Sequence, residues 1–310
     1  MIYKLLLMFL ITGCSHLAPQ FKSIKENYTK KNIPSKSKVK KEVPFIKQEQ
    51  YYCGPSTLAM VMQYYDKDIQ PRDISDNMYI AKVKGTFQQD MISSSRRNGM
   101  MATPIKDFEN LIAEINNDQP IIVFMNLAFD WYPLWHYAVV YGYDLDKEIV
   151  YMHSGEEKNK KWDMVKFERS WKRGDYWGLA VFTPEQTSIS SNEHEHIRSA
   201  ASLENIGKIS EAETAYHSIL KRWPESFNAY MGLGNIAFNK NKYDKAKKMY
   251  ERVLSYKKDH AFAWHNLALT YINLNQKSKA RNSFEKAIKF ANSKYKKIFQ
   301  KSYQSNLNKI

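Results

Sequence analysis

The feature that most constrains the fold of this 310-residue chain is a 34-residue period in its C-terminal third. Residues of one size class recur at this spacing: Ala212, Ala246 and Ala280, then Tyr216, Tyr250 and Phe284, and then Ile219, Val253 and Ala287. A period of this length is typical of paired helices that bury their apolar faces only by stacking on neighbouring pairs. We therefore predict an all-α domain over residues 193–310, made of helix pairs over 193–226, 227–260 and 261–293 and a polar capping helix over 294–308.

The best-defined unit of this period reads Trp264-x-x-Leu267-Ala268-x-x-Tyr271 and continues to Ala280, Phe284 and Ala287. It resembles the tetratricopeptide repeat, in which small residues let two helices cross closely and an aromatic ring fills the gap. The resemblance implies a concave surface that binds a protein partner. Residues 193–310 contain 22 Lys and Arg against 10 Asp and Glu, so an acidic segment is the partner that the charge favours. The alternative is a spacer or dimerisation arm whose charge only keeps it solvated.

The N-terminus has the pattern of an export signal. Residues 1–13 contain one Lys followed by an apolar run that is too short to span a membrane stably, and the run ends in Leu10-Ile11-Thr12-Gly13-Cys14. This ending resembles the lipobox of bacterial lipoproteins, which implies cleavage of a signal peptide before Cys14 and acylation of that residue. Several acyl chains anchor a protein stably to a membrane. The alternatives are an uncleaved signal anchor and a buried cysteine.

The same resemblance implies a location. We expect a lipid-anchored protein of the bacterial cell envelope, and Ser15 in place of Asp favours the outer membrane, facing the periplasm, by the sorting rule of some Gram-negative bacteria. Residues 14–42 are polar, rich in Lys and without helical or strand period, so we interpret them as the lipidated cysteine and a solvated tether. In an exported chain a Lys run suits anionic lipid headgroups, and we predict no nucleic-acid partner.

Composition excludes several other classes of protein. The hydrophobic fraction of 43% excludes a disordered chain. The only cysteines are Cys14 and Cys53, which excludes a disulfide framework and a zinc site of several thiolates. No phosphate-binding loop of the Gly-x-x-x-x-Gly-Lys-Ser/Thr type is present, so the chain is not itself an ATP-driven transporter. Nothing in the sequence indicates a metal or an organic cofactor.

Cys53 is the candidate nucleophile of a middle domain over residues 43–184, which a polar linker over 185–192 separates from the repeats. It precedes Gly54, Pro55 and a helical face of apolar residues, so we expect it at the start of a helix. Partial positive charge at a helix N-terminus favours the thiolate, which is the nucleophilic form of cysteine. The alternative is a buried structural cysteine.

His136 is the candidate base of the same domain. It opens a run of β-branched and aromatic residues over 136–144, and residues 149–154 read as the returning strand of an antiparallel hairpin. A His at the start of a rigid strand is well placed for proton transfer. The alternative is a structural histidine. The remaining predicted elements are strands over 120–125 and 178–182 and helices over 71–82 and 105–117, which complete an α+β domain.

Three residues of this domain carry a resemblance to a known family. Gln48, five residues before Cys53, and His136 in the run His-Tyr-Ala-Val-Val-x-Gly-Tyr resemble the bacteriocin-processing cysteine peptidases, which have a papain-like fold and cut leader peptides after a double glycine. The likeness is closest to bacterial lipoproteins that join such a domain to tetratricopeptide repeats. It implies Cys53 as nucleophile, His136 as general base and Gln48 as donor to the oxyanion, acting on a peptide or protein substrate.

One position departs from that family. Its members carry Asp-Pro at the end of the strand after the His strand, and the Asp orients the imidazole. This chain has His153 and Ser154 there, so both are possible third members of the site, and neither stabilises an imidazolium as a carboxylate does. Asp144, Asp146 and Asn126 are further polar residues that the sequence alone does not place.

The sequence therefore predicts an α+β papain-like cysteine peptidase domain followed by an all-α tetratricopeptide-repeat domain, in a membrane-anchored thiol peptidase whose repeats recruit a partner or substrate. Two other functions stay open: a catalytically weak adaptor that works through its repeats, and a thiol acyltransferase or transglutaminase-like enzyme. An aromatic loop over residues 130–135 either lines a substrate cleft or caps the core.

Overall fold

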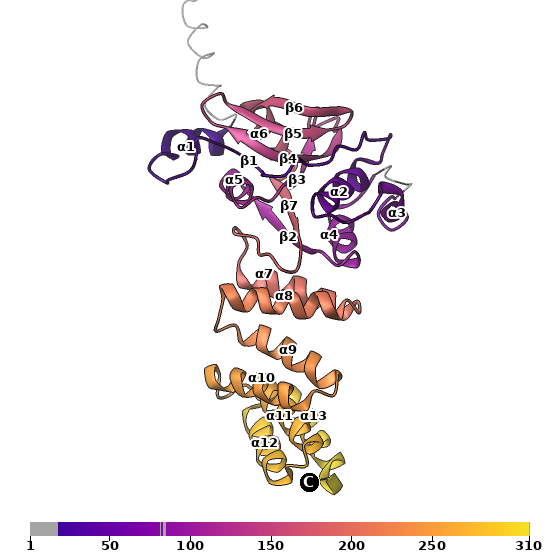
Figure 1. Cartoon of the computed structure of the whole chain (residues 1–310), viewed down its shortest axis with the longest axis vertical. Helices are drawn as coiled ribbons and strands as arrows, with labels where there is room; N and C mark the ends of the chain where they lie inside the picture. The colour runs from indigo at the N-terminus through magenta and orange to yellow at the C-terminus, as the bar shows by residue number, and fades with distance from the viewer. Residues whose placement is uncertain (1–17, 81, 83–84, 310) are drawn as a thin grey trace, which may run out of the picture. The chain divides into compact units, whose positions relative to one another are not determined.

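The structure, a computed structural model, describes residues 18–80, 82 and 85–309 and contains two compact units. The first unit extends to Thr183 and includes Ser188–Asn192, and the second consists of Pro184–Thr187 and the chain from Glu193 onward (Figure 1). The predicted signal peptide and Cys14 lie outside the described residues. No helix in the described part of the chain is long and apolar enough to cross a membrane.

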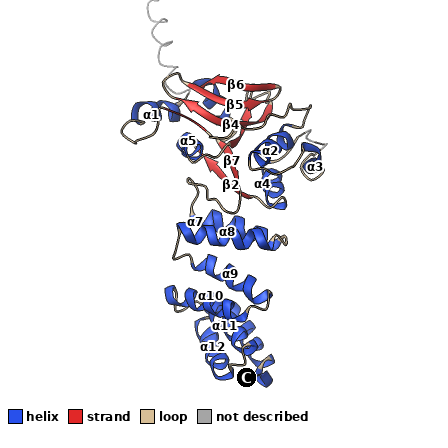
Figure 2. Cartoon of the chain, viewed as in Figure 1, coloured by secondary structure: helices blue, strands red, loops and turns tan. Residues whose placement is uncertain are grey.

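An antiparallel sheet forms the centre of the first unit (Figure 2). Its strands lie in the order β2-β7-β3-β4-β5-β6, and β1 pairs with the far end of β4. The strands are β1 (Lys36–Lys38), β2 (Met101–Lys106), β3 (Ile121–Asn126), β4 (Trp135–Asp144), β5 (Ile149–Ser154), β6 (Glu157–Asp163) and β7 (Trp177–Phe182). The pairing of β4 with β5 confirms the predicted hairpin and puts the candidate base on a central strand.

Helices pack on both faces of this sheet. The helices of the first unit are α1 (Pro19–Asn27), α2 (Cys53–Tyr64), α3 (Pro71–Ser75), α4 (Gln88–Arg97), α5 (Phe108–Asn116) and α6 (Met164–Lys172). Buried side chains of α2, α3 and α4 share one core with alternate residues of β3, β4 and β7. On the other face α1, α5 and α6 meet through the rings of Phe21, Phe108, Phe167 and Trp171. The α+β prediction is confirmed.

Two predicted helices are wrong at their boundaries. The start of the helix predicted over 105–117 belongs to β2, and α5 begins only after Asp107, whose carboxylate accepts a hydrogen bond of 2.7 Å from the N–H of the third helical residue. The helix predicted over 71–82 ends at Ser75, because the chain then turns and buries Met78 in the core. The spacing of apolar residues alone indicated neither the Asp107 cap at the start of α5 nor the early end of α3.

The solvated tether predicted over residues 14–42 is also wrong for the part that the structure describes. Residues 19–27 form α1, which buries Phe21 and Ile24, and its first N–H groups donate to the buried carboxylate of Glu168, at 3.0 Å from Gln20 and 2.8 Å from Phe21. Such N–H groups have no partner within their own helix, so a carboxylate stabilises the helix start. Two apolar residues among many lysines were too weak a pattern to predict this helix.

The predicted linker over 185–192 is fixed to the first unit in its second half. The backbone N–H of Ser190 donates to the buried carboxylate of Glu114 at 2.8 Å, and the Ser188 hydroxyl donates to the same oxygen at 2.5 Å. Ser188 is fully buried. A segment that reads as flexible from its serine content therefore completes the polar surroundings of a buried acid.

The second unit contains the helix pairs predicted from the 34-residue period. Its helices are α7 (Glu193–Asn205), α8 (Ile209–Arg222), α9 (Phe227–Asn239), α10 (Tyr243–Tyr256), α11 (Ala261–Asn273), α12 (Lys277–Phe290) and α13 (Ser293–Ser305). A Cβ atom at Gly232 would lie 2.3 Å from the Tyr216 ring, and one at Gly234 would lie 2.5 Å from the Tyr250 ring. Aromatic rings therefore occupy the space that small residues leave between crossing helices.

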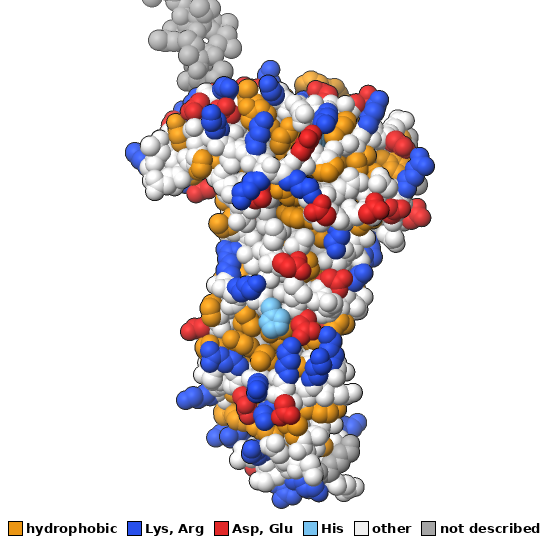
Figure 3. Space-filling model, viewed as in Figure 1, with side chains coloured by type: hydrophobic (Ala, Val, Ile, Leu, Met, Phe, Trp, Pro, Cys, Tyr) orange, Lys and Arg blue, Asp and Glu red, His pale blue; other side chains and the backbone are white. Residues whose placement is uncertain are grey.

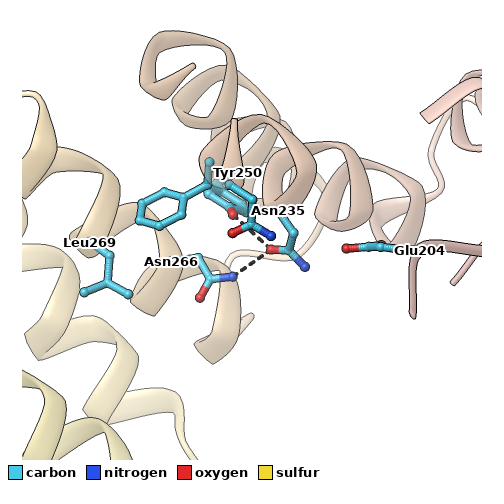
Figure 4. A pocket seen from close by; sticks show the side chains of 7 residues that line it. Glu204, Asn235, Tyr250, Asn266 and Leu269 are labelled. Atoms are coloured by element: carbon cyan, nitrogen blue, oxygen red, sulfur yellow. Dashed lines mark hydrogen bonds between the residues drawn. The ribbon is translucent and has the colours of Figure 1, made fainter. Parts of the chain in front are cut away.

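A pocket of about 330 Å³ lies within the second unit (Figure 4). It is lined from several of the helices by Glu204, Asn235, Phe238, Asn239, Tyr250, Asn266 and Leu269. The Asn235 Oδ1 atom accepts hydrogen bonds from the Tyr250 hydroxyl at 2.9 Å and from the Asn266 amide at 3.0 Å. Amide groups on successive repeats thus form the polar floor of this pocket.

Candidate active site

Cys53 is the first residue of α2, as its sequence context predicts. The turn before it contains Tyr51, whose backbone φ of 68° lies in the left-handed region that residues other than glycine rarely adopt. The Thr57 hydroxyl donates to the Cys53 carbonyl oxygen at 2.8 Å and so holds the first helical turn. The strained turn and this bond fix the partly buried cysteine at the start of an otherwise buried helix.

Gly54 has a packing role beside this cysteine. A Cβ atom at this position would lie 2.6 Å from Oγ1 and 2.7 Å from Cβ of Thr86. Thr86 is held by its backbone, because its carbonyl oxygen accepts a hydrogen bond of 3.1 Å from the Tyr137 hydroxyl. Thr86 is therefore a neighbour of the site that sequence reasoning missed, and no short motif marks it.

Burial controls the ionisation of the Cys53 thiol. It raises the pKa of the thiol, while the backbone N–H groups of Tyr137, Gly54 and Cys53 itself lower it to a smaller extent. The N–H groups at the helix start therefore favour the thiolate, as predicted, but burial opposes them with a larger effect. The same contacts show that the sulfur lies beside the backbone of Tyr137, the residue that follows His136.

His136 is the second residue of β4 and is also kept uncharged by burial. Loss of solvent, with a smaller contribution from the charge of Lys160, lowers the pKa of His136 to about 4. Its Nε2 atom lies 3.1 Å from the Ser154 Oγ atom at the end of β5. A neutral imidazole that donates from Nε2 to this hydroxyl keeps Nδ1 free to accept a proton.

Gln48 joins this cluster through the residue after Ser154. Its backbone N–H donates to the Gly155 carbonyl oxygen at 3.3 Å, and Gly155 lies alongside the imidazole, since a Cβ there would be 3.9 Å from His136 Cε1. The Gln48 side chain is 8% exposed, and its buried Nε2 makes no hydrogen bond with any described residue. A buried amide donor without an acceptor costs about 1–3 kcal/mol, so it calls for a functional reason.

His153 lies apart from the imidazole of His136. Its Nε2 donates to the Val43 carbonyl oxygen at 3.0 Å and its Nδ1 accepts from the Asn159 N–H at 3.1 Å, so both ring nitrogens are used. Successive residues of a strand point to opposite faces, so only one residue of the His153-Ser154 pair can meet His136. Of the two possible third members, Ser154 is the one in contact.

The other polar residues considered for that position have different roles. Asp144 accepts a hydrogen bond from the Lys147 N–H in the turn after β4, and Asp146 accepts one from the Tyr28 hydroxyl. Asn126 supports the aromatic loop, as described below. No group of three or more His, Cys, Asp or Glu side chains among the described residues is arranged to hold a metal ion.

The aromatic loop before His136 does not cap the core. Trp131 is 82% exposed and Tyr132 is 72% exposed. Only Trp135, at the end of the loop, stacks on the first unit, with its ring 5.0 Å from that of Phe124. Of the two roles predicted for the loop, burial over the core is therefore excluded.

Comparisons with known proteins were made for the whole chain. Residues 40–177 match the sequence model of the Peptidase_C39 like family. Residues 207–268 and 263–294 match two models of the tetratricopeptide repeat. No curated protein matches the chain.

Several solved structures are similar to about half of the chain. A protein described as a C39-like peptidase from Bacillus anthracis has 17% identity and a TM-score of 0.41, over 49% of this chain and 98% of its own. A double-glycine-motif protease of an AMS/PCAT transporter, solved with its leader peptide, has 21% identity and a TM-score of 0.37, over 47% and 94%. The peptidase domain of Streptococcus ComA, a bi-functional ABC transporter of a quorum-sensing pathway, has 20% identity and a TM-score of 0.39, over 46% and 98%.

The family matches confirm the family prediction that the residues around Cys53 and His136 carried. They cover α2 to α6 and β2 to β6 of the first unit, and α8 to α12 of the second. This chain thus joins a domain of the C39-like peptidase family, over residues 40–177, to tetratricopeptide repeats.

Proposed function

We propose that this protein is a thiol peptidase of the bacterial cell envelope, anchored to the membrane through an acylated Cys14. The observation that carries the proposal is the buried Gln48 amide, which makes no hydrogen bond with any described residue. Gln48 is bonded through its backbone to Gly155, which lies beside the His136 imidazole. A buried donor of this kind fits an oxygen that becomes negatively charged only during a reaction.

The reaction starts from a neutral pair. Because burial raises the pKa of the Cys53 thiol and lowers that of His136, the proton rests on sulfur in the free protein. His136 accepts this proton at Nδ1 as the sulfur attacks the peptide carbonyl carbon. The carbonyl oxygen takes the negative charge, and the Gln48 amide and the Cys53 backbone N–H donate to it.

The intermediate then breaks down in two steps. His136 returns its proton to the leaving amine as the carbon–nitrogen bond breaks, which leaves a thioester on Cys53. His136 next accepts a proton from water, whose oxygen attacks the thioester, and the proton finally returns to the sulfur as the acid product leaves. Throughout, Ser154 holds the imidazole orientation by accepting from Nε2–H, but its hydroxyl supplies no charge to stabilise the imidazolium.

A labelling experiment tests this proposal directly. An electrophilic peptide probe is expected to label Cys53 in the native protein, to label a His136→Ala variant much more slowly, and not to label Cys53→Ala. Equal rates in the native protein and the His136→Ala variant would contradict the catalytic pair. Mass spectrometry of products from a peptide mixture, with and without an added amine, separates a peptidase from an acyltransferase.

The replacement of the family's Asp favours a second candidate function, that of an adaptor with a weakly active peptidase fold. Ser154 is the only group in hydrogen-bond contact with the His136 ring in the described part of the chain, and it carries no charge. In this case a Cys53→Ala chain would retain its cellular role, whereas loss of residues 193–310 would abolish it. The opposite pattern supports the peptidase.

The repeats are proposed to recruit a partner or substrate with an acidic segment. Lys and Arg side chains are spread over the repeat helices on the face drawn in Figure 3, and the formal charge of residues 193–310 supports electrostatic attraction. Binding of acidic and neutral peptides of equal length to the full chain, compared at low and high salt, tests this part of the proposal. Salt-independent binding of both peptides would contradict it.

A further inference from the structure

The loop that joins β3 to β4 exposes an unusual run of apolar side chains. Six of them are more than a third exposed: Leu127 (37%), Phe129 (65%), Trp131 (82%), Tyr132 (72%), Leu134 (58%) and Trp135 (48%). Single exposed apolar residues are common on proteins, but a contiguous group marks a surface that binds something. We extend the name aromatic loop from residues 130–135 to the whole segment over 127–135.

The buried side chain of Asn126 holds the backbone of the aromatic loop in place. The Oδ1 atom of Asn126 accepts hydrogen bonds from the Ala128 N–H at 3.0 Å and the Leu134 N–H at 2.9 Å, and its Nδ2 donates to the Phe129 carbonyl oxygen at 3.2 Å. The rings of Phe129 and Trp131 stack with centroids 5.6 Å apart. The hydrogen bonds to Asn126 therefore fix the loop backbone in a conformation that leaves the rings exposed to solvent.

Basic side chains of α6 stand beside the aromatic loop. Lys166 and Arg169 of α6, and Arg173 directly after the helix, line a shallow surface pocket together with the near end of the loop. Arg173 also joins the two elements, because its Nη2 atom donates to the Asn126 carbonyl oxygen at 2.9 Å. The loop carries one acid, Asp130, whose carboxylate lies 3.9 Å from Arg173. The surface thus combines projecting rings with positive charge.

We propose that the aromatic loop and the basic side chains of α6 form a surface that docks on an anionic lipid bilayer. Trp and Tyr rings favour the headgroup level of a membrane, where one edge is apolar and the other wet. Lys and Arg beside them are attracted to anionic headgroups. A peptide-binding cleft is concave, whereas Trp131 and Tyr132 are largely exposed, and this geometry favours the bilayer over a peptide substrate.

The position of α1 also favours a membrane-facing orientation of this surface. This argument depends on the proposed function, because it assumes that Cys14 is lipidated. The start of α1 is hydrogen-bonded to Glu168, which belongs to the same helix α6 as the basic side chains. Cys14 precedes Gln20 by six residues, which extend at most about 20 Å. An anchor of this length would therefore hold the start of α1, and with it α6, close to the bilayer.

Vesicle flotation tests the proposal on the chain from residue 14 onward with Cys14→Ser, which carries no acyl chain and keeps every residue that the structure describes. The probes are vesicles of phosphatidylcholine alone and of phosphatidylcholine with 30% phosphatidylglycerol, the latter on the order of the anionic content that attracts basic segments. We expect binding to the anionic vesicles. A W131S/Y132S variant should bind them roughly tenfold more weakly, and a K166Q/R169Q variant should lose the preference for anionic vesicles.

Two further variants complete the design. Phe87→Ser removes an exposed aromatic ring outside the loop (Phe87 is 54% exposed) and should bind as the native sequence does. Cys53→Ala should also bind normally, which separates this inference from the peptidase proposal. The proposal is overturned if the unlipidated chain does not bind anionic vesicles, if W131S/Y132S binds unchanged, or if that variant keeps vesicle binding but loses cleavage of peptides in lipid-free solution, which would make the loop a substrate-binding wall.

Discussion

The Nε2 atom of His136, near the start of β4, lies 3.1 Å from the hydroxyl oxygen of Ser154 at the end of β5. A hydroxyl fixes the ring and its tautomer but adds no negative charge. Ser154 can therefore orient the His136 ring, but it cannot stabilise the positive charge of an imidazolium. Two substitutions of Ser154 test these two effects separately.

Ser154→Ala removes the contact and should lower kcat/KM about fivefold to tenfold, which is the usual effect of losing one neutral hydrogen bond. Ser154→Asp should raise kcat, because a carboxylate stabilises the imidazolium that forms as the thiol loses its proton. Steady-state kinetics on one peptide substrate measures both. A Ser154→Asp variant as slow as Ser154→Ala would show that charge at this position is not limiting.

The pH dependence of cleavage follows from the ionisation of His136. The imidazole must be neutral to accept the thiol proton, and burial lowers its pKa to about 4 from the ordinary 6.5. kcat/KM should therefore rise with pH through about 4 and show no further acid limb near 6.5. In Ser154→Asp the new carboxylate raises the pKa of His136, so the acid limb should move to higher pH. A native acid limb near 6.5 would contradict the assigned burial.

Gln48→Leu should separate activity from stability. Loss of the oxyanion donor should reduce kcat by about 10²–10³, while removal of an unpaired buried amide should stabilise the fold by about 1 kcal/mol. Thermal unfolding and kinetics of the same preparation check both signs. A variant that loses activity and stability together would indicate that Gln48 is a structural residue.

Gly54→Ala should destabilise the first unit by about 1–3 kcal/mol, because the added Cβ would lie 2.6 Å from Thr86 Oγ1 and 2.7 Å from Thr86 Cβ. Thr86→Gly removes both atoms. The double variant should therefore lose less stability than the sum of the two single variants, as measured by urea unfolding. Additive effects would exclude this contact as the cause.

Glu168→Leu should release α1 from the first unit, since the carboxylate accepts the N–H groups of Gln20 and Phe21 and the Tyr176 hydroxyl. Hydrogen exchange over residues 19–27 should become faster, while exchange in the repeats stays unchanged. Glu168→Gln, which keeps an acceptor oxygen, should have a smaller effect. Unchanged exchange in the Leu variant would mean that Phe21 and Ile24 hold the helix without the cap.

The parts of this protein that the sequence predicted well are those where the pattern itself has a period or a fixed order. The spacing of Tyr216, Tyr250 and Phe284 follows from the repeating contact between helices, so one unit predicts the next. The hairpin of β4 and β5 was predicted because strand residues and turn residues alternate clearly there.

The parts that were missed depend on contacts between distant residues. Whether His153 or Ser154 meets His136 depends on the register of two strands, and the ionisation of Cys53 depends on burial, which a helix start does not reveal. The cap on α1 comes from Glu168, nearly 150 residues along the chain. None of these contacts leaves a local signature.

The pairing of β1 with β4 determines where a minimal catalytic fragment has to begin. The carbonyl oxygen of Val43, between β1 and Gln48, accepts a hydrogen bond from Nε2–H of His153. The segment that leads to Gln48 is therefore held to the sheet both by β1 and by Val43. A fragment that begins at residue 43 would lack α1 and β1, and Gln48 would then lie only five residues from a free chain end. The segment before the peptidase-like domain is therefore also a support of the candidate site.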